Sequence, residues 1–294
     1  MSNSLYGISL ALISTASWAI CSILFKKLGE KFDAVSMTTM KAILSSGILF
    51  LIIFFTGAGF IIPNILLLPV ALSGIIGIAA GDSLFFAALN KLSPLALSVI
   101  LLVCPDLFSG IFGAVFLKEF PSFLSWIGIF FIIMGIFLLF KEEENNSKVN
   151  TKITGIIFAI LSLICTSYSM VIIKPVLAQI PVMVTTMYRM FFGGLVLIFI
   201  NIITGQIFGW RKKFNNPTYN LKLAGVIFLV TIGGFCMSLA AVKYCKLIIA
   251  SSLMMLEPLF ILIFMVTFNK YKPSLKEIIG TVIITAGILL ICIG

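Results

Sequence analysis

The second half of the chain repeats the first. Ten residues between Phe116 and Leu138 recur unchanged 152 positions later, between Phe268 and Leu290. In the first copy they are Phe116, Lys118, Pro121, Ser122, Ile127, Gly128, Ile132, Gly135, Ile136 and Leu138. Earlier segments match at a shift of 148, with pairs that include Gly7 and Gly155, Ser14 and Ser162, and Lys26 and Lys174. An internal repeat in an apolar chain is typical of secondary transporter folds, whose substrate site lies between the halves.

The composition is that of a membrane protein. Hydrophobic residues make up 61% of the 294 residues and charged residues 10%, and the mean hydropathy is +1.23. These values exclude a soluble domain with an ordinary polar surface. A helix that spans a bilayer needs about 20 apolar residues, and ten windows of about that length are present. They are Leu5–Phe25, Val35–Thr56, Leu66–Leu89, Pro94–Leu117, Phe123–Phe140, Ile153–Ile173, Val184–Thr204, Leu221–Val242, Leu247–Phe268 and Leu275–Ile293. Because these runs are too long for barrel strands, the sequence predicts an all-α membrane protein with ten transmembrane helices.

The repeat predicts how these helices are organised. Five spans per half is an odd number, so the second half must enter the membrane from the opposite side and the repeats are expected to be inverted around a central cavity. The first five-helix repeat is predicted over 1–140 and the second over 153–294. The polar stretch 141–152 (KEEENNSKVNTK) is too short and too charged to fold by itself and is predicted to be a linker.

Cysteines and basic residues indicate neither a cofactor nor a nucleic-acid partner. The six cysteines have no CxxC spacing and the chain has no histidine, so neither a metal site nor a cofactor is expected. The net charge of +10 is spread over short loops, which favours membrane topology over nucleic-acid binding. Most of this charge lies in the loops that follow odd-numbered spans. The positive-inside rule therefore predicts that these loops are cytoplasmic and that both termini lie outside.

Each half ends in the same series of motifs: a proline-containing span, a Pro-Ser loop, and two glycines seven residues apart. In the first half these are Cys104-Pro105, Pro121-Ser122, Gly128 and Gly135, and in the second half Glu257-Pro258, Pro273-Ser274, Gly280 and Gly287. Over the whole chain this pattern resembles the EamA-like transporter family of the drug/metabolite transporter (DMT) superfamily. The resemblance implies two inverted five-helix repeats around a central cavity. It also implies cytoplasmic termini, opposite to the orientation that the loop charges favour. The acidic residue that it carries over is Glu257, because the first half has Cys-Pro in place of Glu-Pro.

Pro105 and Pro258 lie near the middle of the corresponding fourth and ninth spans. Each removes a backbone hydrogen bond and tends to kink or break its helix. Matching interruptions in both halves indicate a substrate site near the membrane midplane. The alternative is that both prolines are packing features inherited with the duplication.

Five charged residues lie within the predicted spans: Lys41, Asp82, Asp106, Arg189 and Glu257. Each costs about 2.5–3.5 kcal/mol at a helix centre on insertion scales. Glu257 and Asp106 are too deep and too short to reach the interface, so they are expected to face a hydrated cavity. There they can exchange a proton or bind a cationic group, unless they are structural acids bonded between helices.

Lys41 and Arg189 occupy equivalent positions in the second and seventh spans. The inversion places one toward each mouth of the pathway, where they can attract an anionic or zwitterionic substrate. Lys41 is close to the start of its span, however, so its flexible stem could instead reach the interface. Asp82 lies toward the same face and is a candidate ion-pair partner for Lys41.

Three aromatic residues, Trp18, Tyr168 and Tyr188, lie among small hydroxyl residues in the spans. They could stack on a ring or hold an ammonium group by cation–π attraction. They could equally be ordinary helix-packing residues.

These observations favour a secondary transporter over an enzyme. The predicted protein moves a small polar metabolite, with an amino acid or similar zwitterion favoured, across the cytoplasmic membrane by alternating access. A proton or counter-substrate is a possible coupling partner, and the lipid bilayer is the solvent. The alternatives are a non-transporting membrane protein and a membrane-embedded lipid-modifying enzyme. The sequence does not indicate the oligomeric state.

Overall fold

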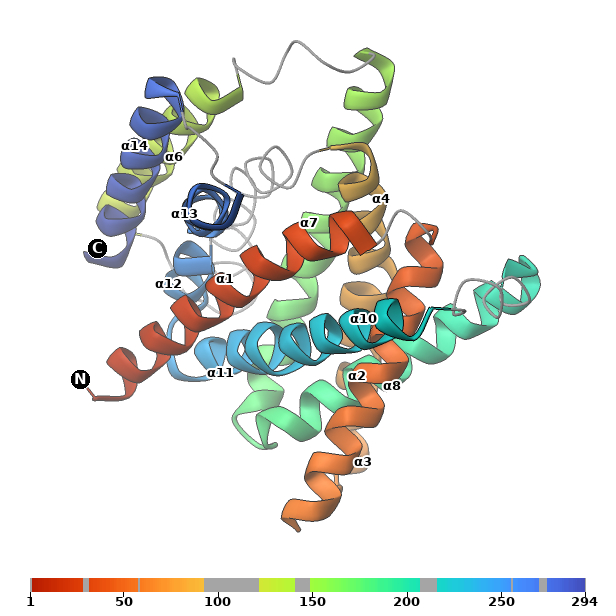
Figure 1. The fold of residues 1–294 in the computed structure, drawn as a ribbon. Coiled ribbons are helices and arrows are strands. Elements are labelled where there is room, and N and C mark those ends of the chain that lie inside the picture. The colour runs from red at the N-terminus through yellow and green to blue at the C-terminus, as the bar shows by residue number, and fades with distance from the viewer. Residues whose placement is uncertain are drawn as a thin grey trace.

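A computed structural model describes residues 2–28, 32–57, 59–92, 122–140, 149–206, 216–254, 256–269 and 274–293. All regular secondary structure in these ranges is helical (Figure 1). The α-helices are α1 (Ser2–Leu28), α2 (Ala34–Thr56), α3 (Asn64–Gly74), α4 (Ser83–Lys91), α6 (Phe123–Phe140), α7 (Val149–Leu177), α8 (Val182–Ile203), α10 (Pro217–Leu229), α11 (Met237–Tyr244), α12 (Leu247–Met254), α13 (Glu257–Asn269) and α14 (Leu275–Ile293). Two π-helical segments, Ile75–Asp82 and Val230–Cys236, join α3 to α4 and α10 to α11.

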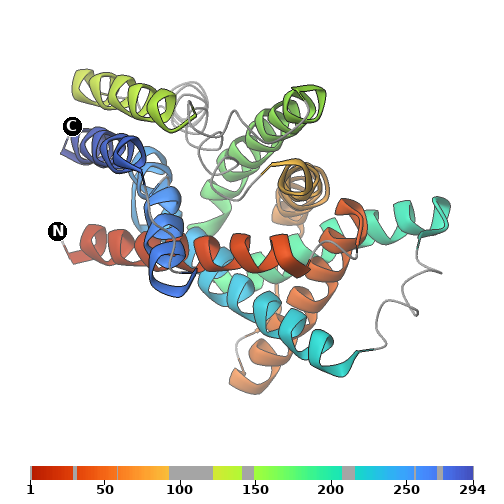
Figure 2. The same ribbon diagram turned by 45° about the horizontal axis from the view of Figure 1, so that its top comes forward.

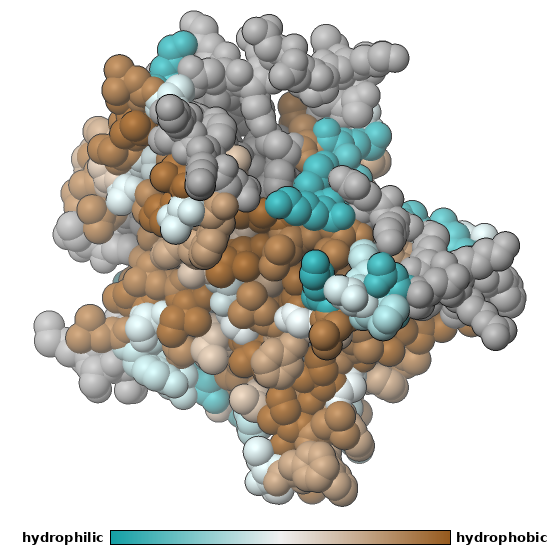
Figure 3. Space-filling view, in the orientation of Figure 1, coloured by the Kyte–Doolittle hydropathy of each residue, from teal (hydrophilic) through white to brown (hydrophobic). Residues whose placement is uncertain are grey.

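Six of the described helices are long and apolar enough to cross a membrane. They cover Leu5–Leu28, Ala34–Thr56, Asn64–Lys91, Ile153–Leu177, Val182–Ile203 and Pro217–Tyr244. Shorter apolar helices cover Phe123–Gly135, Glu257–Phe268 and Ile278–Gly287. Hydrophobic residues dominate the face drawn in Figure 3, with hydrophilic residues gathered over the C-terminal ends of α1 and α4. The all-α, multi-pass prediction is therefore confirmed. The count of ten spans is not confirmed, because the expected fourth span, Pro94–Leu117, lies outside the described residues.

The polar stretch that is predicted to be the linker is described only at its C-terminal end. Helix α7 begins at Val149, so residues 149–152 of the expected linker are already helical. Residues 141–148 lie outside the described ranges. A helix can continue past its apolar window in this way because each added residue gains a backbone hydrogen bond once the first turn has formed.

The ends of equivalent helices show the repeat in the backbone itself. Helix α2 is followed by Gly57 with φ +68°, and α8 is followed by Thr204 and then by Gly205 with φ +70°, 148 residues after Gly57. Only glycine adopts this left-handed conformation without strain. Leu92 after α4 and Cys245 after α11 share an extended conformation, with φ/ψ of −115°/160° and −120°/163°. The third helix of each half therefore corresponds at a shift of 153.

The two halves interlock rather than forming separate bundles. Helix α1 packs against α11 of the other half, and its equivalent α7 packs against α4. Two further pairs join a helix to its own equivalent, α2 with α8 and α6 with α14. The last pair lies side by side in both Figure 1 and Figure 2. Each of these four contacts crosses from one repeat to the other, so the centre of the molecule is built from both.

The equivalent helices α2 and α8 run antiparallel, as inverted repeats require. Near the start of α2, the Ser36 hydroxyl lies 3.0 Å from the side-chain oxygen of Asn201 near the end of α8. Farther along α2, the Ala42 Cβ lies 3.5 Å from the position of a Cβ built on Gly194, which is earlier in α8. A separation of 3.5 Å is ordinary van der Waals contact, so the two helices pack directly against each other at this crossing.

Candidate functional site

The two π-helical segments are held by a matched pair of hydrogen bonds. The Ser14 hydroxyl of α1 donates to the Gly234 carbonyl at 2.9 Å, and the Ser162 hydroxyl of α7 donates to the Gly81 carbonyl at 2.8 Å. The widened turn of a π-helix leaves carbonyls available for such bonds and is frequent at functional sites. Because Asp82 directly follows Gly81, the Ser162 bond also fixes the position of this acid.

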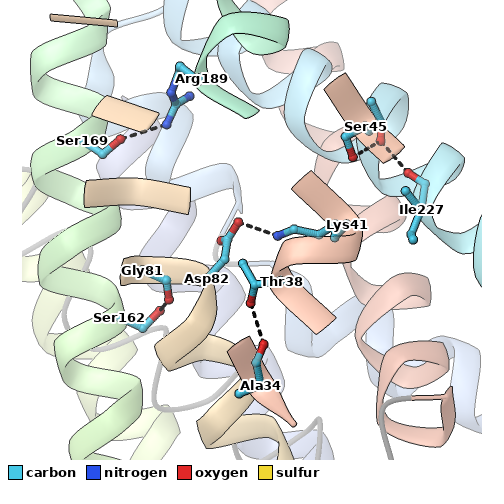
Figure 4. A network of polar contacts seen from close by, with 11 residues as sticks. Ala34, Thr38, Lys41, Ser45, Gly81, Asp82, Ser162, Ser169, Arg189 and Ile227 are labelled. Atoms are coloured by element: carbon cyan, nitrogen blue, oxygen red, sulfur yellow. Dashed lines mark hydrogen bonds and ion pairs between the residues drawn. The ribbon is translucent and has the colours of Figure 1, made fainter. Parts of the chain in front are cut away.

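Lys41 and Asp82 form a buried ion pair at the centre of the molecule. The ammonium of Lys41 on α2 donates to Oδ2 of Asp82 (Figure 4). Lys41 is 0% exposed and Asp82 is 5% exposed. The pairing with Asp82 considered from the sequence is therefore present, and the alternative, in which the Lys41 stem reaches the interface, is not what the structure shows. The reason is that Asp82 offers the ammonium a charged partner inside the bundle, so the side chain turns inward.

Aromatic rings surround the Lys41 ammonium. Its Nζ lies 4.6 Å from the ring centroid of Phe235, 5.3 Å from that of Phe86 and 5.9 Å from that of Trp18. Trp18 and Phe235 pack edge to face with centroids 4.9 Å apart. Ring faces carry partial negative charge, so this arrangement stabilises a desolvated cation. Trp18 thus lies beside Lys41, together with two phenylalanines that the sequence did not single out.

Arg189 of α8 supplies a second buried cation. It is 2% exposed, and its Nη2 donates to the Ser169 hydroxyl of α7 at 2.8 Å (Figure 4). The same hydroxyl donates to the Ser73 carbonyl at 2.8 Å. Asp82 lies within electrostatic range of the guanidinium. The Nε of Arg189 has no hydrogen-bond acceptor among the described residues.

Glu257 lies where the ninth span is interrupted. Helix α12 ends at Met254 and α13 begins at Glu257, with Pro258 in the first turn, where its missing N–H costs little. The Glu257 carboxylate accepts a hydrogen bond from the Ser22 hydroxyl of α1 at 2.7 Å. Cys21, next to Ser22, lies within electrostatic range of both Glu257 and Lys41, so α1 connects this acid to the central cluster.

The other candidates fall outside the cluster or outside the described residues. Tyr188 donates to the Phe60 carbonyl at 3.1 Å and stacks on Phe192, so it packs against the segment that follows α2. Tyr168 of α7 is 37% exposed. Pro105 and Asp106 lie within the part of the chain that the structure does not describe. In the described part, no group of three His, Cys, Asp or Glu side chains could hold a metal ion.

Sequence reasoning missed the hydroxyls that hold the charged groups. Ser22 bonds Glu257, and Ser169 bonds Arg189. Their only signal in the sequence is a small polar residue in an apolar helix, which is common wherever helices pack closely. Deciding which of these serines faces a charge requires the positions of the neighbouring helices.

The described site is thus a charged cluster deep in an apolar bundle, with side chains from both repeats. Lys41 and Asp82 come from the first repeat, while Arg189 and Phe235 come from the second. Such a site can bind a charged or zwitterionic small molecule, because ionic interactions are much stronger in a desolvated setting than in water.

Comparisons with known proteins agree with this architecture. A family model described as the EamA-like transporter family matches residues 5–141 and again residues 153–293. No curated protein matches the chain. A solved crystal structure, described only as that of a protein, is 17% identical with a TM-score of 0.72, and the match covers 100% of this chain and 98% of that chain. At this identity the likeness shows the fold alone. The family match covers nearly the whole chain in two copies, and the chain therefore belongs to the EamA-like transporter family.

Proposed function

We propose that the protein is a secondary transporter that moves a small polar metabolite across the cytoplasmic membrane by alternating access, with an amino acid or similar zwitterion favoured. Membership of the EamA-like family makes the chain a membrane transporter of the DMT type. The substrate, the mechanism and the energy source are the parts that we propose. The two functional units are the five-helix repeats over 1–140 and 153–294, joined by the segment 141–152.

The observation that carries the proposal is the buried cluster of Lys41, Asp82 and Arg189. Charged groups in the hydrocarbon region are costly and most often mark a transport pathway. These three come from helices of both repeats, and the substrate sites of transporters with inverted repeats lie at such junctions. A cluster with both signs of charge suits a zwitterion better than an uncharged sugar.

Alternating access is supported by the paired contacts between the halves. Helix α1 meets the second π-helical segment and α7 meets the first, each through one serine hydroxyl and a closely packed glycine. Two equivalent contacts can exchange roles as one repeat rocks against the other. The helix break before Glu257 supplies a local hinge.

Glu257 is the proposed coupling group. It is partly exposed and its carboxylate is held by the Ser22 hydroxyl, so it can exchange a proton during the transport cycle. Replacement Glu257→Gln should make flux independent of an imposed proton gradient while substrate binding remains. Asp33→Asn is the matched control, because Asp33 caps α2 and asparagine caps a helix equally well. Unchanged gradient dependence in Glu257→Gln would remove the coupling assignment.

The experiment that tests the function is a flux assay with purified protein in liposomes. A panel of labelled amino acids, sugars and organic cations is offered with and without a proton gradient, and counterflow is measured for each compound. We expect saturable, protein-dependent flux for at least one zwitterion. A protein that is folded and correctly inserted but moves no compound of the panel would favour the non-transporting alternative.

A further inference from the structure

Among the described residues, the buried cluster carries an unbalanced charge. Lys41 and Arg189 contribute two positive charges and Asp82 contributes one negative charge, which leaves a net charge of +1 on these three side chains, each at most 5% exposed. Glu257 accepts a hydrogen bond from Ser22 instead. A net charge that is shielded from water strongly attracts a counter-ion.

The internal symmetry shows which described position lacks the acid that its equivalent carries. Lys41 and Arg189 are equivalent at the shift of 148 that relates α2 to α8. Asp82 is equivalent to Phe235 at the shift of 153 that relates the third helices, because each directly follows a glycine whose carbonyl accepts the matched serine bond. Lys41, the cation of the first repeat, thus has the acid Asp82 as its partner. For Arg189, the cation of the second repeat, the equivalent position holds Phe235.

One N–H group of the Arg189 side chain is also available to donate a hydrogen bond. Its Nη2 donates to Ser169, but its Nε–H lacks an acceptor among the described residues although the side chain is 2% exposed. A buried donor without a partner costs as much as the hydrogen bond it fails to make. Nε–H and the adjacent Nη2 point the same way in a guanidinium, which is the geometry that a planar carboxylate matches.

We infer that the substrate carries one carboxylate and that Arg189 binds it. This carboxylate would play toward Arg189 the part that Asp82 plays toward Lys41, because the position equivalent to Asp82 holds Phe235. The inference rests on the proposed transport function and names the substrate class of the same site. A single carboxylate balances the positive charge of Arg189 at the point of contact, whether or not the substrate carries an ammonium group elsewhere. A neutral sugar offers no charge to the guanidinium.

Binding of simple carboxylates tests the inference directly. Purified protein in detergent is heated in a fixed chloride background with acetate, propionate or butyrate, and in parallel with acetamide, propionamide or butyramide. We expect the carboxylates to raise the midpoint of thermal unfolding in a saturable manner, since a ligand of the folded state stabilises it, and the amides to have no effect. Equal shifts from both series, or an equal shift from added chloride alone, would overturn the inference.

Two sets of variants locate the site. Arg189→Lys keeps the charge but loses the paired N–H groups, and it should weaken carboxylate binding by about tenfold or more, the worth of a charge-assisted hydrogen bond. Phe235→Asp supplies the missing acid and should abolish the carboxylate response, whereas the matched control Phe235→Asn should retain it. Carboxylate binding of wild-type strength in Arg189→Lys would overturn the assignment even if the Phe235 variants fail to fold.

The readout separates this inference from the proposed function. Carboxylate binding that depends on Arg189, in a protein that moves no compound in liposomes, would support the site and refute transport. Flux of a metabolite without a carboxylate, together with no response to the carboxylate series, would support transport and refute the carboxylate site.

Discussion

At the scale of single residues, the central question is why an ion pair persists inside an apolar bundle. Removing two charges from water costs several kcal/mol per ion, and their attraction repays this cost only with good geometry and further partners. Here the Lys41 ammonium has both the Asp82 carboxylate and three aromatic rings. The pair is therefore tolerated, but either member alone would be strongly unfavourable.

We expect Lys41→Met and Asp82→Leu each to destabilise the protein by about 3–5 kcal/mol, because each leaves its partner buried and uncompensated. The double variant Lys41→Met/Asp82→Leu should lose much less unfolding free energy than the sum of the losses in the two single variants. Thermal unfolding in one detergent provides the comparison as a double-mutant cycle. Additive losses would mean that the two side chains do not stabilise each other.

At the scale of helices, close approach between α3 and α8 depends on two glycines. A Cβ built on Gly193 would lie 2.8 Å from the Gly74 carbonyl oxygen, and one built on Gly74 would collide with the backbone of Arg189. Backbone atoms cannot move aside as a flexible side chain can. This contact therefore sets the distance between the helices that carry Asp82 and Arg189.

Gly74→Ala and Gly193→Ala should each destabilise the protein by about 1–3 kcal/mol through overpacking. Gly47→Ala and Gly225→Ala are the controls, since nothing lies within 4 Å of the added methyl group at either site. The controls should be neutral or stabilising by about 0.5–1 kcal/mol, because alanine is the better helix former. If the unfolding midpoints of the Gly74 and Gly193 variants equalled those of the two controls, the close contact between α3 and α8 would be contradicted.

At the scale of the whole molecule, the dominant feature is an approximate two-fold relation between the halves. The serine bonds from α1 and α7, the left-handed caps after α2 and α8, and the packing of α1 on α11 and α7 on α4 all occur twice. Lys41 and Arg189 follow the same relation, but Asp82 and Phe235 do not match. The fold is thus nearly symmetric, while the charge at its centre is not.

The symmetry predicts that substitutions at equivalent positions lower the stability of the protein equally and independently. Ser14→Ala and Ser162→Ala should each cost about 1 kcal/mol, the typical worth of one hydrogen bond. The loss of unfolding free energy in the double variant should equal the sum of the two single losses, because the two hydrogen bonds share no residue. Thermal unfolding of the three variants checks this, and a clear difference between the single variants would show that the halves contribute unequally.

The inverted repeat also predicts that both termini lie on one side of the membrane. Reporter fusions at the N- and C-termini should give the same answer, whichever side that is. The loop charges favour the outside and the family resemblance favours the cytoplasm, so the same fusions decide the orientation. Reporters on opposite sides would require an odd number of spans and would refute the five-plus-five arrangement.

Much of the helical architecture could be predicted from local sequence. The expected windows Val35–Thr56 and Phe123–Phe140 agree with α2 and α6 to within one residue, because a lipid-facing helix must be apolar along its whole length. The break near Pro258 could likewise be predicted from the sequence, since proline disfavours a continuous helix. The direction of a side chain could not be predicted in this way. The sequence leaves open whether Lys41 reaches the interface or pairs with Asp82, and in the structure it pairs with Asp82.

The sequence by itself determined that the solvent is lipid, that the chain is duplicated and that its elements are helices, because hydropathy and repetition are properties of contiguous segments. Only the tertiary structure decided which buried groups meet. Asp82 pairs with Lys41, the Nε–H of Arg189 has no acceptor among the described residues, and Phe235 occupies the position equivalent to Asp82. These relations depend on distances between helices that are remote in the chain, and such distances exist only once the two halves have packed together.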